Sequence, residues 1–206
     1  MMTQSGKGKQ MEHSIAQYLA RRLLRYVPDT EEKYPVYVYG FELILSFAFS
    51  AVIIICVGFL VSQPMTSLAF MTTYILIRRY TGGYHAETYW QCKLYTVGIF
   101  LLVLLLSVLT RIPLWAFLIT SVVGEAVVFK FAPIKNKHKV LSEKKQKQNK
   151  GIALFAFPLL TVSSYSLSLF NRIIGNTVFF SLISVVVLMI IQIIRERRTS
   201  HASEHL

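Results

Sequence analysis

The chain has 206 residues, of which 54% are hydrophobic, and a formal net charge of +12 at neutral pH. Its apolar residues occur in runs too long for the interior of a soluble domain of this size, which excludes an ordinary soluble fold. The positive charge does not indicate nucleic-acid binding, because no aromatic–basic interleaving or zinc spacing accompanies the lysines. The two cysteines, Cys56 and Cys92, offer no metal-ligand spacing either, so we expect no metal and no cofactor.

Residues 1–36 are expected to form a cytoplasmic N-terminus that contains one amphipathic helix. Apolar residues recur at helical spacing from Met11 to Tyr26, together with three arginines, and Pro28 ends the pattern. Such a basic amphipathic helix beside a membrane span is typical of an interfacial helix on anionic lipid. A helix that packs on the protein's own cytoplasmic loops explains the pattern equally well.

Six apolar segments follow and predict membrane helices. They cover residues 38–61, 65–78, 94–110, 113–131, 152–170 and 177–194. We therefore expect an all-α membrane protein with about six transmembrane helices in addition to the N-terminal interfacial helix. The second segment is short, because its 13 residues from Met65 to Ile77 would rise only about 20 Å against a hydrocarbon core of about 30 Å. We interpret it as a true but short span.

Positive charges predict the orientation of the chain in the membrane. With six spans, the N-terminus, two of the loops and the C-terminus share one side, which holds 6, 3, 8 and 3 Lys/Arg, or 20 of the 22. Only Arg111 and Arg172 remain on the other side. We expect a multi-pass protein of the cell membrane with both termini in the cytoplasm. Its single membrane domain would cover residues 37–196, with a basic cytoplasmic loop at 132–151 and a tail at 197–206.

The cytoplasmic segment 78–93 combines residues that suit cysteine catalysis. A thiol is a useful nucleophile only as a thiolate, and its free pKa of about 8.5 leaves little of it ionised at neutral pH. His85 can take the proton of Cys92, and the nearby cations of Lys93, Arg78 and Arg79 would favour the thiolate further.

The spacing of His85 and Cys92 requires a bend in the chain. On one unbroken helix, residues seven apart face the same way, but their Cα atoms lie about 10.5 Å apart. Gly82 and Gly83 provide the backbone freedom for a bend, so we expect a loop at His85 and a helix that begins near Ala86.

Two neighbours of the pair are candidates for supporting roles. Glu87 either orients the imidazole, as the third member of a triad does, or lies in a first helical turn because the helix dipole favours an acid there. Gln91 is a candidate hydrogen-bond donor to an oxyanion.

The segment resembles the accessory gene regulator B (AgrB) family, the membrane peptidases of Gram-positive quorum sensing. The resemblance covers the whole chain in layout, from the basic amphipathic N-terminus through six apolar segments to an Ala-Pro pair before a basic loop. Its specific part lies within residues 78–92 and consists of Arg78, Arg79, Gly82, Gly83, His85, Ala86 and Cys92.

The resemblance implies a cysteine endopeptidase with Cys92 as nucleophile and His85 as base. Family members cut a short propeptide near its C-terminus, and the resulting thioester is attacked by a side chain of the peptide itself to close a thiolactone or lactone. The family's propeptides have an amphipathic helix and an acidic C-terminal tail. A cluster of lysines is a candidate to bind such a tail, or else only sets topology and meets anionic lipid. The cluster consists of Lys135, Lys137, Lys139, Lys144, Lys145, Lys147 and Lys150.

Two other functions remain open from the sequence. A small peptide transporter without proteolytic chemistry would need charged residues midway through several spans, and only Glu125 qualifies. A membrane scaffold or sensor subunit would depend on neither Cys92 nor His85. Glu42 is expected at the membrane interface. The resemblance also suggests a homodimer, for which the serine-rich fifth segment is a possible interface.

Overall fold

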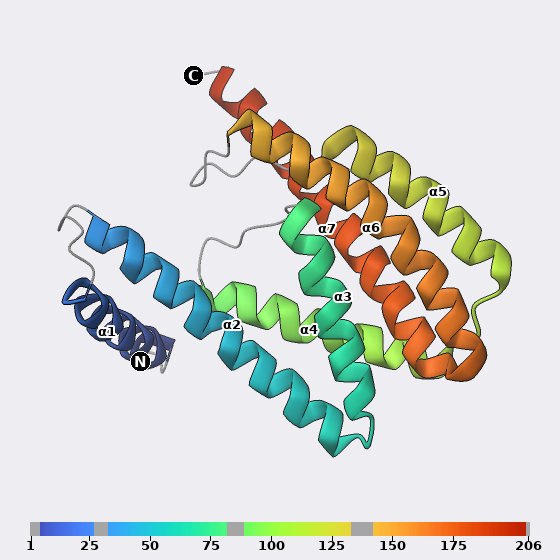
Figure 1. Ribbon diagram of the computed structural model, residues 1–206, viewed down its shortest axis with the longest axis horizontal. Helices are drawn as coiled ribbons and strands as arrows, with labels where there is room; N and C mark the ends of the chain where they lie inside the picture. Colours follow the sequence, from blue (N-terminus) through green and yellow to red (C-terminus); the bar gives the residue numbers. More distant parts are fainter. Residues whose placement is uncertain (1–4, 27–32, 82–88, 133–141, 205–206) are drawn as a thin grey trace. The chain divides into compact units, whose positions relative to one another are not determined.

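The computed structural model describes residues 5–26, 33–81, 89–132 and 142–204, and the regular structure in these ranges is helical throughout. Figure 1 shows the helices in chain order. They are α1 (Ser5–Leu24), α2 (Tyr34–Leu60), α3 (Pro64–Thr81), α4 (Tyr89–Leu109), α5 (Leu114–Phe131), α6 (Glu143–Phe170) and α7 (Arg172–Glu204). The prediction of an all-α membrane protein is confirmed.

Each of the six predicted apolar segments falls in one of the helices α2 to α7, but the helices differ in how well they suit a bilayer. Among the described residues, four are long and apolar enough to cross a membrane: α2, α5, α6 and the part Arg172–Arg195 of α7. The apolar part of α4, Lys93–Leu109, is shorter. α3 has 18 residues, a rise of about 27 Å, because its polar last turn continues the helix beyond the apolar stretch.

Several helices begin earlier than their apolar pattern predicts, and the differences are largest for α1 and α6. α1 begins at Ser5 rather than near Met11, and α6 begins at Glu143 rather than near residue 152. Hydrophobic periodicity marks only the part of a helix that is buried or in lipid, whereas Lys, Gln and Glu extend a helix readily into water. The second half of the expected basic loop, residues 143–150, is therefore helical.

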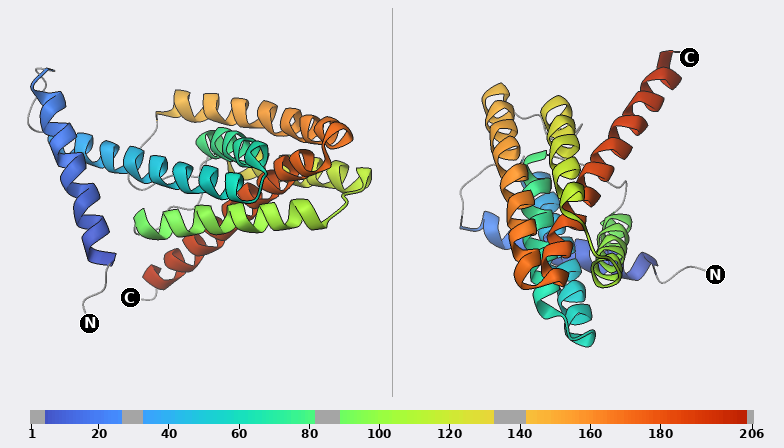
Figure 2. Two further views of the ribbon diagram at one scale, coloured as in Figure 1. Left: turned by 90° about the horizontal axis from the view of Figure 1, so that it is seen from below. Right: turned by 90° about the vertical axis from the view of Figure 1, so that its right-hand side faces the viewer.

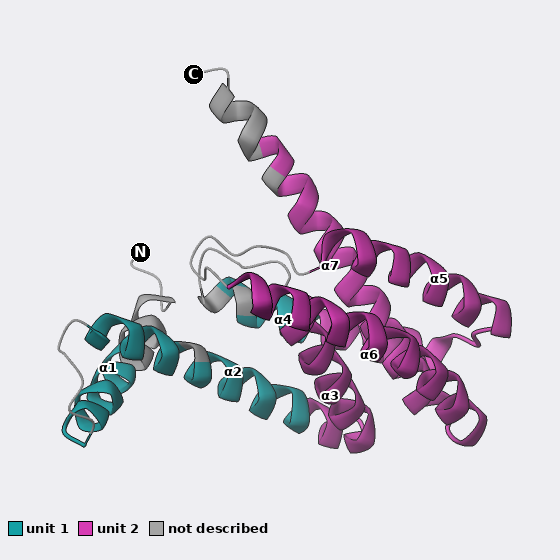
Figure 3. Ribbon diagram, turned by 45° about the horizontal axis from the view of Figure 1, so that its top comes forward, with its two compact units in different colours: residues 1–56, 86–98 teal, residues 57–85, 99–206 magenta. Residues whose placement is uncertain are grey.

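The described chain forms two compact units, shown in Figure 3. Unit 1 consists of residues 1–56 and 86–98, and unit 2 of residues 57–85 and 99–206. The boundaries fall inside α2 and α4, so each of these helices contributes to both units.

In unit 1, α1 crosses the first part of α2 (Figure 2). Ala16 and Ala20 of α1 are fully buried in a small apolar cluster with Val38 of α2. The opposite side of α1 is open, with Tyr18 64% exposed and Arg22 and Arg25 exposed beside it. α1 therefore packs on a helix of its own chain through its smallest side chains and leaves a basic, partly apolar face uncovered.

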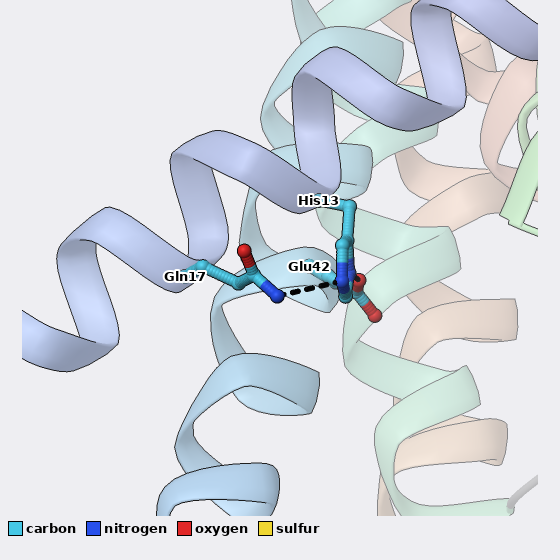
Figure 4. A network of polar contacts seen from close by, with 3 residues as sticks. All are labelled: His13, Gln17 and Glu42. Carbon is cyan, nitrogen blue, oxygen red and sulfur yellow. Dashed lines mark hydrogen bonds and ion pairs between the residues drawn. The ribbon is translucent and has the colours of Figure 1, made fainter.

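A polar contact also joins α1 to α2, as Figure 4 shows. Nδ1 of His13 donates to Oε1 of Glu42 at 2.5 Å, and Nε2 of Gln17 donates to Nε2 of the same ring at 2.9 Å. An acidic side chain near a membrane is costly without a partner. The pair therefore offsets the cost of Glu42 and fixes the side of α2 on which α1 lies.

The turn between α2 and α3 is a Schellman motif in unit 2. Ser62 adopts a positive φ of 56°, and the backbone N–H of Gln63 donates to the carbonyl of Gly58 at 2.7 Å. The N–H of Ser62 donates to the carbonyl of Phe59 at 3.0 Å. These bonds satisfy the last carbonyls of α2, and Pro64 then begins α3 where its missing N–H costs nothing.

The rest of unit 2 is built around the hairpin of α6 and α7. α3 and α5 each pack on both of these helices, and Figure 1 shows the four together. Close approach depends on small residues: a Cβ on Gly124 of α5 would overlap the buried ring of Phe157 in α6, and a Cβ on Gly175 of α7 would overlap Ser168 of α6. Ser164 donates to the carbonyl of Gly175 at 2.8 Å, so this serine of the fifth segment packs within the chain.

The C-terminal end of α4 is fastened to the start of α7 within unit 2. Nδ2 of Asn176 donates to the carbonyls of Ser107 at 3.1 Å and Thr110 at 2.9 Å. Arg172 also donates to the carbonyl of Thr110, at 3.1 Å. The last carbonyls of a helix lack partners of their own and carry negative partial charge, so an amide and a guanidinium suit them.

The positive charges of unit 2 are divided between its two ends. The end of α3, the end of α5, the start of α6 and the end of α7 lie at one end of the unit (Figure 1). They carry most of its lysines and arginines, whereas Arg172 begins α7 at the opposite end. This arrangement matches the grouping of charges from which the sequence predicted the orientation.

Candidate active site

The segment 78–93 begins in the last turn of α3, where Arg78 is held by an aromatic pair. An Nη of Arg78 donates to the hydroxyl of Tyr74, and the guanidinium carbon lies 5.2 Å from the centre of the Tyr74 ring. Tyr74 is buried and stacks on Phe70 with a centroid distance of 5.1 Å. Arg78 is thus a half-buried cation with a defined direction, rather than a freely rotating surface arginine.

The backbone at the end of α3 is also fixed. Thr81 is fully buried and its hydroxyl donates to the carbonyl of Ile77 at 3.0 Å. Arg79 is exposed, and its guanidinium carbon lies 5.9 Å from the ring centre of Tyr80. Two arginines in a last turn interact favourably with the helix dipole, so the chain leaves α3 from an ordered, positively charged end.

Four of the predicted site residues lie outside the described residues: Gly82, Gly83, His85 and Glu87. The bend at the glycines and the contact between His85 and Cys92 therefore remain predictions. The described part of α4 begins at Tyr89, whereas the sequence predicted a helix start near Ala86, which also lies outside the described residues.

Cys92 lies in the first turn of α4. The first backbone N–H groups of a helix have no partner within the helix, and the dipole gives this end a positive partial charge. The side chain of Cys92 lies outside the described part of the chain, so a bias of this thiol toward its thiolate remains a prediction. Gln91, the candidate oxyanion donor, is exposed one residue earlier in the same turn.

Lys93 follows Cys92 and is buried, with 5% of its surface exposed. Its Nζ lies 4.9 Å from the ring centre of Phe49 in α2, within unit 1. The sequence marked Lys93 as a nearby cation, but gave no sign that it is buried.

Part of the predicted lysine cluster lies within the described residues. Lys135, Lys137 and Lys139 lie outside the described residues. The other four lie in the first turns of α6, where Lys144, Lys145 and Lys147 are exposed and Lys150 is half-buried, its Nζ 4.7 Å from the ring centre of Phe129. Lysines oppose the dipole at a helix start, so helix stability does not explain their position. Binding of an acidic tail, and a role in topology and contact with anionic lipid, both remain predictions.

Sequence reasoning missed two features of these units. The first is the contact between Arg78 and Tyr74, which are four residues apart on one helix; this spacing could have predicted their contact from the sequence. The second is the His13–Glu42 pair, which joins residues 29 apart and so had no local sequence pattern to predict it.

Glu125, in α5, is half-buried, and its Oε2 has no hydrogen-bond partner among the described residues.

These features define a class: a multi-pass α-helical membrane protein with a cysteine in the first turn of a helix, preceded by a basic helix end. Comparison with known proteins gives the family. The family model described as accessory gene regulator B matches residues 13–194. The chain belongs to the accessory gene regulator B family, whose members take part in quorum sensing.

Several curated proteins resemble the chain. An AgrB-like protein of Clostridium perfringens (strain SM101) is 25% identical over 88% of this chain and 86% of its own length. An AgrB-like protein of Halalkalibacterium halodurans is 24% identical, over 80% and 83%. Accessory gene regulator protein B of Staphylococcus intermedius is 26% identical, over 59% and 64%. No solved structure shows a significant match.

Proposed function

We propose that this chain is a membrane cysteine endopeptidase that cleaves a quorum-sensing propeptide near its C-terminus and promotes closure of a thiolactone or lactone ring. One observation carries the proposal: Cys92 lies in the first turn of the described part of α4 and follows, in the sequence, an Arg-Arg-x-x-Gly-Gly-x-His frame whose two arginines lie in the last turn of α3. Membership of the accessory gene regulator B family supports the proposal, because the resemblance described above implies that family members process a short propeptide.

The first step forms an acyl-enzyme. His85 takes the thiol proton of Cys92, and the thiolate sulfur attacks the carbonyl carbon of the scissile peptide bond. The oxyanion that develops needs donors, for which the side chain of Gln91 and the N–H groups at the start of α4 are candidates. His85 then gives its proton to the departing amine, the C–N bond breaks, and the N-terminal part of the peptide remains as a thioester on Cys92.

The second step transfers the acyl group within the peptide. A thiol or hydroxyl of the peptide attacks the thioester carbonyl, loses its proton to His85 and releases the sulfur of Cys92. Transfer to another thiol exchanges one thioester for another, whereas hydrolysis would discard that energy. A nucleophile held in the same bound peptide has a large effective molarity, so ring closure outcompetes water.

We assign two sets of basic side chains to binding of the substrate. Arg78, seated on Tyr74, directs its guanidinium from a fixed helix end and is suited to bind a peptide carbonyl or carboxylate. The exposed lysines of α6, Lys144, Lys145 and Lys147, are assigned to the acidic tail. Both lie on the cytoplasmic side in this proposal, because the excess of Lys/Arg marks that side.

The test is co-expression of the full chain with a small propeptide encoded beside its gene. Wild type should release the C-terminal part of the propeptide, and Cys92→Ala and His85→Ala should each abolish release at unchanged membrane levels. Cys56→Ala provides a matched control, because Cys56 is an exposed cysteine in α2 and its loss should leave processing unchanged. Full processing by Cys92→Ala would overturn the proposal.

A further inference from the structure

Lys150 differs from the other lysines that the structure describes in α6. Lys144, Lys145 and Lys147 are exposed, whereas Lys150 is half-buried. Its Nζ lies 4.7 Å from the ring centre of Phe129 in α5, which is within the distance of a cation–π contact. The ammonium group of Lys150 is therefore held against a neighbouring helix instead of extending into water as surface lysines do.

The position of Lys150 on α6 explains this contact. Lys150 precedes Phe157 by seven residues, about two helical turns, so both side chains lie on the same face of the helix. Phe157 is buried on that face and packs against Gly124 of α5. Lys150 thus lies at the joint between α5 and α6, both of which belong to unit 2.

This joint lies where the apolar parts of both helices end. α5 is long and apolar enough to span a membrane and ends at Phe131, two residues after Phe129. The apolar run of α6 begins near Ile152, two residues after Lys150. The ring of Phe129 is 63% exposed, so it is available to acyl chains at the level where lipid headgroups meet them.

The positive charge at the joint has no acidic partner among the described residues, because Lys150 forms no ion pair with any of them. Glu125 lies four residues before Phe129, about 6 Å deeper along α5, and Glu143 lies at the start of α6. The connecting sequence 133–141 contains no acidic residue. Lys130 follows Phe129 directly, is exposed and adds a second positive charge.

We propose that the α5–α6 joint is a binding site for an anionic phospholipid, whose phosphate pairs with Lys150 and whose acyl chain lies on the exposed ring of Phe129. A zwitterionic headgroup brings its own ammonium group close to Lys150, so the site prefers a lipid with a net negative charge. The inference is independent of the proposed peptidase chemistry. It assigns Lys150 to lipid and leaves the exposed lysines of α6 to the peptide's tail.

The test is native mass spectrometry of the full-length protein in detergent micelles, titrated with phosphatidylglycerol and, separately, with phosphatidylcholine. The wild type should bind phosphatidylglycerol more tightly. Lys150→Met should raise the Kd for phosphatidylglycerol about fivefold, the contribution of one lysine to anionic lipid, and leave that for phosphatidylcholine unchanged. Lys150→Arg, which keeps the charge, should bind as the wild type does.

Two further variants keep the test decisive. Lys144→Met is the matched control, because it removes a lysine of the same helix that is exposed to water, and it should leave the Kd unchanged. Lys150→Gln should weaken binding of phosphatidylglycerol as Lys150→Met does, and it retains a polar side chain if the methionine variant fails to fold.

Three results would overturn the inference. Equal losses for Lys150→Met and Lys144→Met would show diffuse attraction to a basic surface instead of a site. Equal affinity of the wild type for the two lipids would show that the negative charge is not recognised. Displacement of the lipid by inorganic phosphate at the same concentration would show a site for free anions. None of these results bears on propeptide cleavage, which is measured separately.

Discussion

At the scale of single residues, side chains that take no part in the proposed reaction fix the position of a charged residue of the candidate site. Tyr74 and Phe70 are stacked inside unit 2 and give Arg78 a fixed seat. A planar guanidinium with a defined direction recognises carbonyl or carboxylate groups more selectively than a mobile one. Arg78, the first charged residue of the segment 78–93, is thereby held in a defined position by its contacts within α3.

Tyr74→Phe tests this seat. The substitution removes the hydroxyl that accepts from Arg78 but keeps the ring stacked on Phe70. A hydrogen bond to a charged group contributes about 1.5–3 kcal/mol, so we expect processing of the propeptide to slow about tenfold with the fold intact. Tyr80→Phe, which alters the neighbouring tyrosine near Arg79, is the control. Equal rates for Tyr74→Phe and wild type would show that the seat is unimportant.

A second residue-scale prediction concerns the pair of His13 and Glu42. Glu42→Gln removes the charge that His13 meets at 2.5 Å and should loosen α1 from α2. Amide hydrogen exchange should then rise across residues 13–24 and change little in α5 and α6. Unaltered protection of α1 would mean that the apolar cluster around Ala16 and Ala20 holds it unaided.

At the scale of helices, small residues set how closely α5 approaches α6. A methyl group on Gly124 would overlap the buried Phe157 ring, whereas one on Gly98 of α4 would meet nothing within 4 Å. Overpacking of a filled contact costs about 1–3 kcal/mol. Gly124→Ala should therefore lower the melting temperature in detergent, and Gly98→Ala should leave it unchanged or raise it. The reverse order would contradict the packing.

The cap of α4 by Asn176 is a second prediction at this scale. Asn176→Ala deprives the carbonyls of Ser107 and Thr110 of their shared donor, and polar contacts between membrane helices contribute about 0.6–2 kcal/mol. We expect a loss of that size in the free energy of unfolding in mixed micelles. Asn149→Ala, in the polar start of α6, should change it far less. A similar loss in both would show that the cap contributes nothing specific.

At the scale of the whole molecule, charge placement predicts orientation. Ser142, at the start of α6, and Ser62, between α2 and α3, should lie on opposite sides of the membrane. With both native cysteines replaced, Ser62→Cys should react with an impermeant maleimide in intact cells, and Ser142→Cys only after permeabilisation. Labelling of Ser142→Cys in intact cells would contradict cytoplasmic termini.

The sequence was sufficient to predict where the membrane helices lie in the chain, but not which contacts join them. Apolar runs and turn residues located α2 to α7, because lipid requires long apolar helices whatever their neighbours. The capping of Ser107 by Asn176, 69 residues later, and the burial of Lys93 depend on how distant helices pack, which no local pattern encodes. Among the site residues, Arg78 lies in the last turn of α3 and Cys92 in the first turn of the described part of α4, whereas the predicted helix start near Ala86, the position of His85 and the roles of all three residues remain predictions.

The most direct test of the central claim is detection of the acyl-enzyme. A propeptide whose ring-closing side chain is replaced by alanine can be cleaved but cannot cyclise, so the thioester should accumulate. Mass spectrometry of the full-length protein should find the N-terminal part of the peptide attached to Cys92, and hydroxylamine should remove it. Cleavage of this peptide with no hydroxylamine-sensitive adduct on Cys92 would contradict the account.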